Sequence, residues 1–203
     1  MGDESVTIRA MVFMVGNEGD IISSIDVSTA FLQSESYDPN NVPRYVSYQP
    51  CKSVPIQYYQ LLGPLYGQRS ASMRWYSTLK QWLLSQGFVP GLNEPCVFTH
   101  ANGLRVAVWV DDIIVRGSKQ MTEQFYDRLG KRFDIKDPSY LTPHSPLCFV
   151  GLDIEEQDTT QGPMRVVHQN NVMSEYLNSL DITPNPMIQC PMPEAKVLWT
   201  VKL

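Results

Sequence analysis

The feature that most constrains this chain is a pair of adjacent aspartates, Asp111 and Asp112, within an apolar run that extends from Val106 to Val115. β-Branched runs of this kind are typical of strands. Two carboxylates between two such runs are expected at the tip of a hairpin, where both can point past the end of a sheet. Like charges held this close repel each other and raise each other's pKa unless a cation lies between them. The alternative interpretation is an ordinary turn, because aspartate is favoured in turns whatever its function.

The size and charge of the chain limit the kinds of function to consider. It has 203 residues and a net charge of −5, and it is long enough for one large or two small domains. Because nucleic-acid-binding proteins usually carry a basic footprint, such a role would need a local patch, counter-cations or a basic segment outside this chain. No apolar run is long enough to span a bilayer, and the four cysteines lack zinc-ribbon or redox spacing. We therefore expect an intracellular protein with no membrane partner.

Apolar spacing and turn signals predict an ordered series of helices and strands. They comprise a helix near residues 8–15, a strand over Ile21–Val27, a loop over 34–41, two Tyr-rich strands over Arg44–Tyr48 and Gln57–Leu62, a helix capped by Ser70 and ending near Gln86, a hairpin formed by Cys96–His100 and Leu104–Val110, a strand over Ile113–Arg116, a helix carrying Met121, Phe125 and Leu129, strand candidates over Phe133–Ile135, Leu147–Glu155 and Met164–His168, and a last helix capped by Asn170.

This order fits an α+β fold, with an antiparallel sheet and helices on one face in the general style of the ferredoxin-like plan. We assign residues 1–183 to one domain. Residues 184–203 are rich in proline and are expected to form an extended tail.

A third carboxylate, Asp26, lies near the end of the strand predicted over Ile21–Val27. If that strand is adjacent to the Asp111–Asp112 hairpin, the three aspartates meet at one edge of the sheet. Carboxylate oxygens suit Mg²⁺ or Mn²⁺, which are hard cations. Two such ions can activate an attacking hydroxyl and stabilise the leaving oxygen in a phosphoryl transfer.

Six segments resemble, in family order, the conserved blocks of copia-type retrotransposon reverse transcriptases. They are Ser24–Leu32 (motif A), Leu65–Tyr76 (the motif B region), Gly87–Phe98, Trp109–Ser118 (motif C), Arg132–Asp137 and Phe149–Glu155. Each block alone is weak, but their order over most of residues 7–193 is highly specific.

The resemblance implies a role for each matching residue. Asp26, Asp111 and Asp112 are the catalytic and metal-binding carboxylates, with Asp112 in a supporting electrostatic role. Phe31 lies under the incoming sugar and rejects a 2′-hydroxyl, although packing into the core is the competing interpretation. The remaining nucleotide- and template-binding candidates are Tyr66, Gly67, Arg69 and Lys136; Lys136 is either a partner of the departing pyrophosphate or a surface residue.

The activity implied is that of an RNA-directed DNA polymerase, a nucleotidyltransferase that uses two Mg²⁺ ions, or Mn²⁺, to join a deoxynucleotide to a primer 3′-hydroxyl. The implied partners are an RNA template, a DNA primer, deoxynucleoside triphosphates and the rest of a polyprotein with fingers, ribonuclease H and integrase parts. The resemblance also implies a palm with incomplete fingers, and a location in a cytoplasmic virus-like particle or the nucleus.

The chain departs from the family at the first position of motif C. Family members usually have Tyr or Phe there, whereas this chain has Trp109. Basic fingers strands, which family members place before motif A, are expected to be largely missing. One alternative is therefore a degenerate, non-catalytic remnant that keeps the palm fold and at most weak nucleic-acid binding. A second alternative is a nucleotidyl cyclase or another palm enzyme, against which the motif B block argues.

Overall fold

A computed structural model describes residues 19–38, 40–160, 162–169, 176 and 179. Several predicted features lie wholly or largely outside the described residues. They are the helix expected near residues 8–15, the last helix capped by Asn170, the Pro-rich tail and the domain boundary at residues 183 and 184. Within the described part, no helix is both long enough and apolar enough to cross a membrane.

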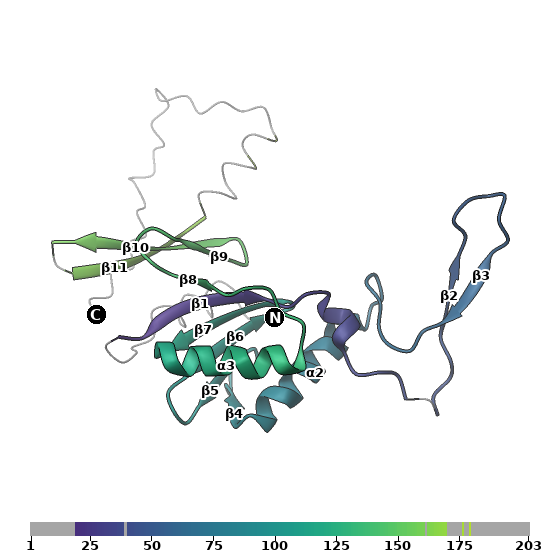
Figure 1. Ribbon diagram of the computed structural model, residues 1–203, viewed down its shortest axis with the longest axis horizontal. Helices are drawn as coiled ribbons and strands as arrows, with labels where there is room; N and C mark the ends of the chain where they lie inside the picture. Colours follow the sequence, from purple (N-terminus) through teal and green to yellow (C-terminus); the bar gives the residue numbers. More distant parts are fainter. Residues whose placement is uncertain (1–18, 39, 161, 170–175, 177–178, 180–203) are drawn as a thin grey trace.

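The centre of the fold is a six-stranded antiparallel sheet with the strand order β4-β5-β6-β7-β1-β8 (Figure 1). Its strands are β1 (Ile21–Asp26), β4 (Phe88–Pro90), β5 (Val97–His100), β6 (Arg105–Trp109), β7 (Asp112–Gly117) and β8 (Ser139–Tyr140). Four of these were predicted from sequence, whereas the short β4 and β8 were not. The order places β1 directly beside β7, so a strand from the start of the described chain borders the strand that begins at Asp112.

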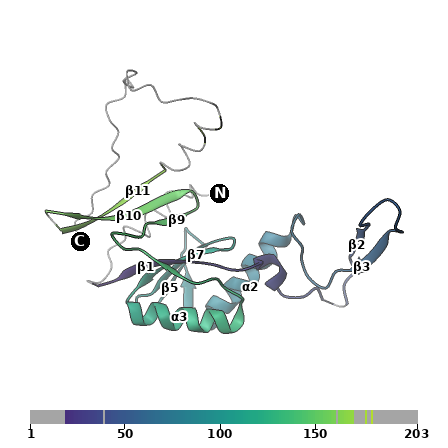
Figure 2. The ribbon, with the colours of Figure 1, turned by 45° about the horizontal axis from the view of Figure 1, so that its top comes forward.

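Two helices, α2 (Ala71–Ser85) and α3 (Lys119–Arg132), pack on one face of this sheet (Figures 1 and 2). The buried side chains between helices and sheet include Trp75, Leu79 and Leu83 from α2, Phe125 and Leu129 from α3, and Ile25, Val106, Val108, Ile113 and Val115 from the strands. The fold class predicted from sequence, α+β with antiparallel sheet, is confirmed at this level. Helix α2 begins after Ser70 as predicted, but the Ser70 side chain makes no capping hydrogen bond.

A three-stranded sheet covers part of the opposite face. It is formed by β9 (Leu147–Phe149), β10 (Leu152–Thr159) and β11 (Gly162–His168), in the order β11-β10-β9. The prediction of one strand over Leu147–Glu155 was wrong. Val150 and Gly151 have φ values of 52° and 71°, and two consecutive residues with positive φ reverse the chain rather than extend it.

A two-stranded hairpin projects away from the body of the molecule (Figures 1 and 2). Its strands, β2 (Tyr45–Tyr48) and β3 (Gln57–Gln60), pair in antiparallel register, and every residue in both is exposed. The sequence predicted both strands with ends one or two residues longer. The short 3-10 helix η1 (Ala30–Gln33), which follows β1, was not predicted.

Candidate active site

The Asp111–Asp112 pair lies at a hairpin, as predicted. Strands β6 and β7 are antiparallel with Trp109 opposite Asp112, and Val110 and Asp111 form the turn between them. Val110 has a φ of 53°, in a region that β-branched residues rarely adopt and that two-residue hairpins usually give to glycine or asparagine. The backbone of the turn is therefore held in an unfavourable conformation directly before Asp111.

Asp26 lies beside this turn. It is the last residue of β1 and stands opposite Asp112, the first residue of β7. The Val27 N–H donates a hydrogen bond of 2.9 Å to the carbonyl oxygen of Asp111. Because directly opposed residues of antiparallel strands project to the same face, the Asp26 and Asp112 side chains share one face at the same end of the sheet. The structure thus brings the three predicted aspartates together at one edge.

The proximity of the carboxylates affects the acidity of Asp112. Burial raises the pKa of Asp112, and the negative charges of Asp111 and then Asp26 raise it further, while Lys136 acts in the opposite direction. The site therefore concentrates negative charge at a half-buried position, which a cation would relieve. In the described part of the chain, however, no three His, Cys, Asp or Glu side chains are arranged so that together they could hold a metal ion.

Lys136 supplies the positive charge that faces these carboxylates. Its Nζ lies 2.9 Å from Asp26 Oδ1, and its backbone N–H donates a 2.9 Å hydrogen bond to the Asp26 carbonyl oxygen. The hydrogen bond to Asp26, followed by the charge of that carboxylate, raises the pKa of Lys136. The side chain is 65% exposed, so the lysine is both a surface residue and a member of the cluster. The sequence did not predict its direct pairing with Asp26.

The segment that carries Lys136 is positioned by a side chain that the sequence analysis missed. Gln33 of η1 donates from Nε2 to the Asp134 carbonyl oxygen at 2.9 Å and accepts from the Asp134 N–H at 2.7 Å. The strand predicted over Phe133–Ile135 was wrong, because among the described residues this segment forms a single bridge, between Ile135 and Val27. The Gln33 amide adds to the backbone hydrogen bond from the Ser28 N–H to the Asp134 carbonyl oxygen, and it gives the Asp134 N–H an acceptor.

Phe31 and Tyr66 are in contact. Their ring centroids are 4.7 Å apart with an interplanar angle of 40°. Phe31 is partly buried against the helix-side core, whereas Tyr66 is 55% exposed. Gly67 follows with a φ of 87°, a conformation for which glycine is the default residue. Arg69 is exposed, and it forms no ion pair with the residues that the structure describes.

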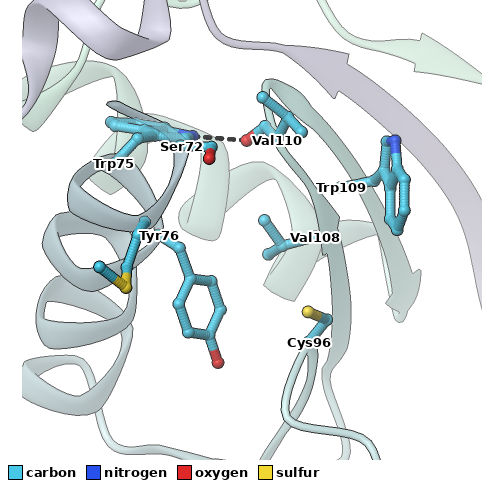
Figure 3. Close-up of a pocket in the computed structure, with 8 residues that line it drawn as sticks. Ser72, Trp75, Tyr76, Cys96, Val108, Trp109 and Val110 are labelled. Atoms are coloured by element: carbon cyan, nitrogen blue, oxygen red, sulfur yellow. Dashed lines mark hydrogen bonds between the residues drawn. The ribbon is translucent and has the colours of Figure 1, made fainter. Parts of the chain in front are cut away.

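A cleft lies between α2 and the end of the β6–β7 hairpin (Figure 3). Its lining consists of Ser72, Met73, Trp75, Tyr76, Cys96, Val108, Trp109 and Val110. Figure 3 shows Tyr76 and Val108 on opposite walls, and the indole of Trp75 hydrogen-bonded to the Val110 carbonyl oxygen. Trp109, the residue that departs from the family motif, packs partly against the core beneath the three-stranded sheet.

Comparison of the sequence with known proteins assigns the chain to a family. Residues 4–194 match the family described as reverse transcriptase (RNA-dependent DNA polymerase). The chain belongs to this family. The match and the relatives below confirm the identification with copia-type retrotransposon reverse transcriptases that the motifs indicated.

The relatives are polyproteins of transposons. The Retrovirus-related Pol polyprotein from transposon RE1 of Arabidopsis thaliana is 30% identical over 141 residues, which are 66% of this chain and 9% of the relative. The corresponding protein from transposon RE2 of the same plant is 28% identical over 166 residues, or 78% of this chain and 11% of the relative. The Transposon Ty1-MR1 Gag-Pol polyprotein of Saccharomyces cerevisiae is 22% identical over 169 residues, or 81% of this chain and 9% of the relative. The chain thus spans about a tenth of the length of these relatives.

Proposed function

We propose that this chain forms the palm of an RNA-directed DNA polymerase, with the β2–β3 hairpin as part of the fingers. The observation that carries the proposal is the register of β1 and β7, which sets Asp26 opposite Asp112 with Asp111 in the adjoining turn. Membership of the reverse transcriptase family supports the same assignment. In this proposal the partners are an RNA template, a DNA primer and deoxynucleoside triphosphates, and the chain acts as part of a larger polyprotein.

The donor set at the carboxylate edge suits a divalent cation. Asp26 and Asp111 would hold Mg²⁺ or Mn²⁺ through hard oxygen ligands, with Asp112 adding negative charge nearby. When bound, the ions supply charge neutralisation and activation of the primer hydroxyl. Burial, and then the negative charges of Asp111 and Asp26, raise the pKa of Asp112, and a cation bound at this edge would offset that charge. Since Lys136 Nζ lies against Asp26, the lysine and a metal ion would compete for that carboxylate.

The other residues act by positioning and charge. During transfer the primer oxygen bonds to the α-phosphorus, and the bond from that phosphorus to the pyrophosphate oxygen breaks. Lys136 would neutralise charge on the departing pyrophosphate. The contact between Phe31 and Tyr66 would place two aromatic rings where the sugar binds, leaving no room for a 2′-hydroxyl. Gly67 and Arg69 would lie along the nucleotide and template.

Primer extension tests this function. The full chain is incubated with a DNA primer on an RNA template, deoxynucleoside triphosphates and Mg²⁺. Asp111→Asn is expected to reduce extension by at least about a hundredfold, as losses of electrostatic stabilisation at reaction centres commonly do. Asp127→Asn, a matched change on the exposed side of α3, is expected to leave extension unchanged. Equal extension by wild type and Asp111→Asn would contradict the proposal.

A non-catalytic remnant is the second candidate. It is favoured by one observation, that no three metal-ligating side chains are arranged to hold an ion in the described part of the chain. A wild-type chain that binds template–primer but extends no primer with Mg²⁺ or Mn²⁺ would establish this candidate in place of the polymerase.

A further inference from the structure

Two arginines stack on one tyrosine. The Cζ atoms of Arg44 and Arg74 each lie 4.5 Å from the centroid of the Tyr37 ring. The ring is itself fixed, because the Tyr37 hydroxyl donates to Gln68 Oε1 at 2.7 Å and the Tyr37 N–H donates to the Leu62 carbonyl oxygen at 2.7 Å. Tyr37 therefore gathers two guanidinium groups from separate segments, the entry to β2 and the first turns of α2.

Both arginines line a cleft beside α2. The lining consists of Glu35, Arg44, Ser70, Met73, Arg74, Ser77, Thr78 and Gln81. In the described part of the chain, neither arginine forms an ion pair with a carboxylate. This includes the carboxylate of Glu35, which lies in the same cleft. The Glu35 N–H donates to Thr78 Oγ1 at 3.1 Å. The cleft thus holds two arginines and one carboxylate, Glu35, and this carboxylate forms an ion pair with neither arginine.

The sequence around the cleft is depleted of acidic residues. No aspartate or glutamate occurs between Asp38 and Glu94, although the chain as a whole has a net charge of −5. The basic residues of this stretch are Arg44, Lys52, Arg69, Arg74 and Lys80. Positive charge is therefore concentrated on the part of the fold that contains the β2–β3 hairpin and α2, which is the local basic patch that an acidic nucleic-acid-binding protein requires.

We propose that the Arg44–Tyr37–Arg74 cleft binds phosphate groups of a single-stranded nucleic-acid backbone. A guanidinium fork matches phosphate geometry, and stacking on an aromatic ring pre-orders the fork. The exposed tyrosines of the adjoining hairpin, Tyr45 and Tyr58 among them, offer faces on which bases stack without regard to sequence. Only the identification of the bound strand as a template rests on the proposed function. The charge and geometry of the cleft do not depend on it.

The test measures binding of a fluorescein-labelled single-stranded RNA 12-mer to the full chain by fluorescence anisotropy across a salt series. For a single strand, each phosphate contact contributes about 0.7 to the slope of log binding constant against log salt concentration. Losing one contact therefore lowers the affinity roughly fivefold at 0.1 M salt. Arg44→Gln and Arg74→Gln are each expected to weaken binding by about that factor. The double variant is expected to lower the slope by about 1.4 and to do so equally for oligo-U and oligo-A.

Matched variants separate this site from general charge effects. Arg128→Gln, an exposed arginine on α3, removes the same charge away from the cleft and is expected to change affinity by less than about twofold. Tyr37→Phe keeps the ring but loses its hydrogen bond to Gln68, and it is expected to weaken binding less than Tyr37→Leu, which removes the platform. Circular dichroism melts of all variants identify any loss caused by unfolding.

The two sources of phosphate are distinguished by a competition arm with dTTP. If the arginine variants weaken RNA binding and leave dTTP binding unchanged, the ligand is the nucleic-acid backbone. An equal loss of dTTP binding would reassign the cleft to a nucleoside triphosphate and overturn the proposal. It is also overturned if wild type binds no RNA, or if the double variant matches Arg128→Gln in affinity and salt slope. If the chain extends no primer but still binds RNA through the two arginines, the polymerase assignment is contradicted and the proposed phosphate-binding cleft stands.

Discussion

The indole N–H of Trp75 donates a hydrogen bond to the carbonyl oxygen of Val110, the residue directly before Asp111 (Figure 3). Trp75 is 1% exposed, and its ring meets Phe133 edge-on at a centroid distance of 5.2 Å. The bond therefore ties the turn, whose Val110 has a φ of 53°, to the rigid helix α2. Because an isolated β-branched residue is unstable in this conformation, we infer that Trp75 keeps the Asp111 backbone in place.

Trp75→Phe is expected to loosen the turn. The phenyl ring keeps part of the packing and removes the hydrogen-bond donor, which is worth about 0.5–1.5 kcal/mol. The Val27 N–H, which donates to the Asp111 carbonyl oxygen, reports the turn directly. Its hydrogen exchange, followed by NMR, should accelerate by about three- to tenfold, whereas the Lys136 N–H, bonded to Asp26, should change less.

Trp82→Phe is the control for this change. Trp82 also lies in α2 and also packs against Phe133, at a centroid distance of 5.7 Å, but it makes no hydrogen bond to the turn among the contacts of the described residues. Equal acceleration at Val27 in both variants would show that Trp75 acts through packing alone.

Asp112→Asn is expected to stabilise the fold at neutral pH. Burial and the charges of Asp111 and Asp26 raise the pKa of Asp112. A carboxyl group with a raised folded-state pKa stabilises the fold below its unfolded pKa, near 3.9, and that contribution is lost as pH rises through the folded value. The amide removes the repulsion, so the melting temperature at pH 7 should rise by a few degrees. The gain should vanish near pH 3.

Asp127→Asn is the matched comparison, since Asp127 is exposed on α3. Thermal melts of the three proteins from pH 3 to pH 8 provide the measurement. A melting temperature for Asp112→Asn at or below that of wild type at pH 7 would contradict the expected repulsion at the carboxylate edge.

Lys136→Met is expected to change metal binding and catalysis in opposite directions. The ammonium lies 2.9 Å from Asp26 Oδ1, where it competes with a divalent cation for the same carboxylate. Removing it should tighten Mn²⁺ binding by about three- to tenfold, as measured by electron paramagnetic resonance, while primer extension falls. Lys119→Met, on an exposed lysine of α3, should alter neither. Weaker Mn²⁺ binding by Lys136→Met would show that the lysine supports the site instead of competing for it.

The sequence predicted the elements whose pattern is local. Helix α2 has apolar residues at helical spacing and ends at Ser85, two residues before Gly87, whose φ is 86°, and β7 follows from its continuous β-branched run. Strands β4 and β8 were missed because such short strands exist only through pairing with neighbours. The meeting of the three aspartates was predicted on the condition that the Asp26 strand and the Asp111–Asp112 hairpin are adjacent, and the pairing of β1 with β7 meets that condition. The contacts of Gln33 with Asp134 could not be predicted, since they join positions 101 residues apart.

A buried hydrogen bond joins β1 to α3 behind the carboxylate edge. Ser23 Oγ and the Tyr126 hydroxyl are 2.7 Å apart, and the two residues are 0% and 6% exposed. Tyr126→Phe leaves the serine hydroxyl buried without this partner, which should cost about 1–3 kcal/mol in the free energy of unfolding, and the Ser23→Ala/Tyr126→Phe double variant should recover part of it.

Burial raises the pKa of Tyr126 well above its ordinary range. The folded state therefore keeps the phenol neutral while the unfolded chain ionises, so stability should fall as pH rises above about 10. Urea unfolding at pH 8 and pH 10.5 measures this loss, which should be smaller in Tyr126→Phe; an equal loss in both proteins would assign the alkaline destabilisation to other groups.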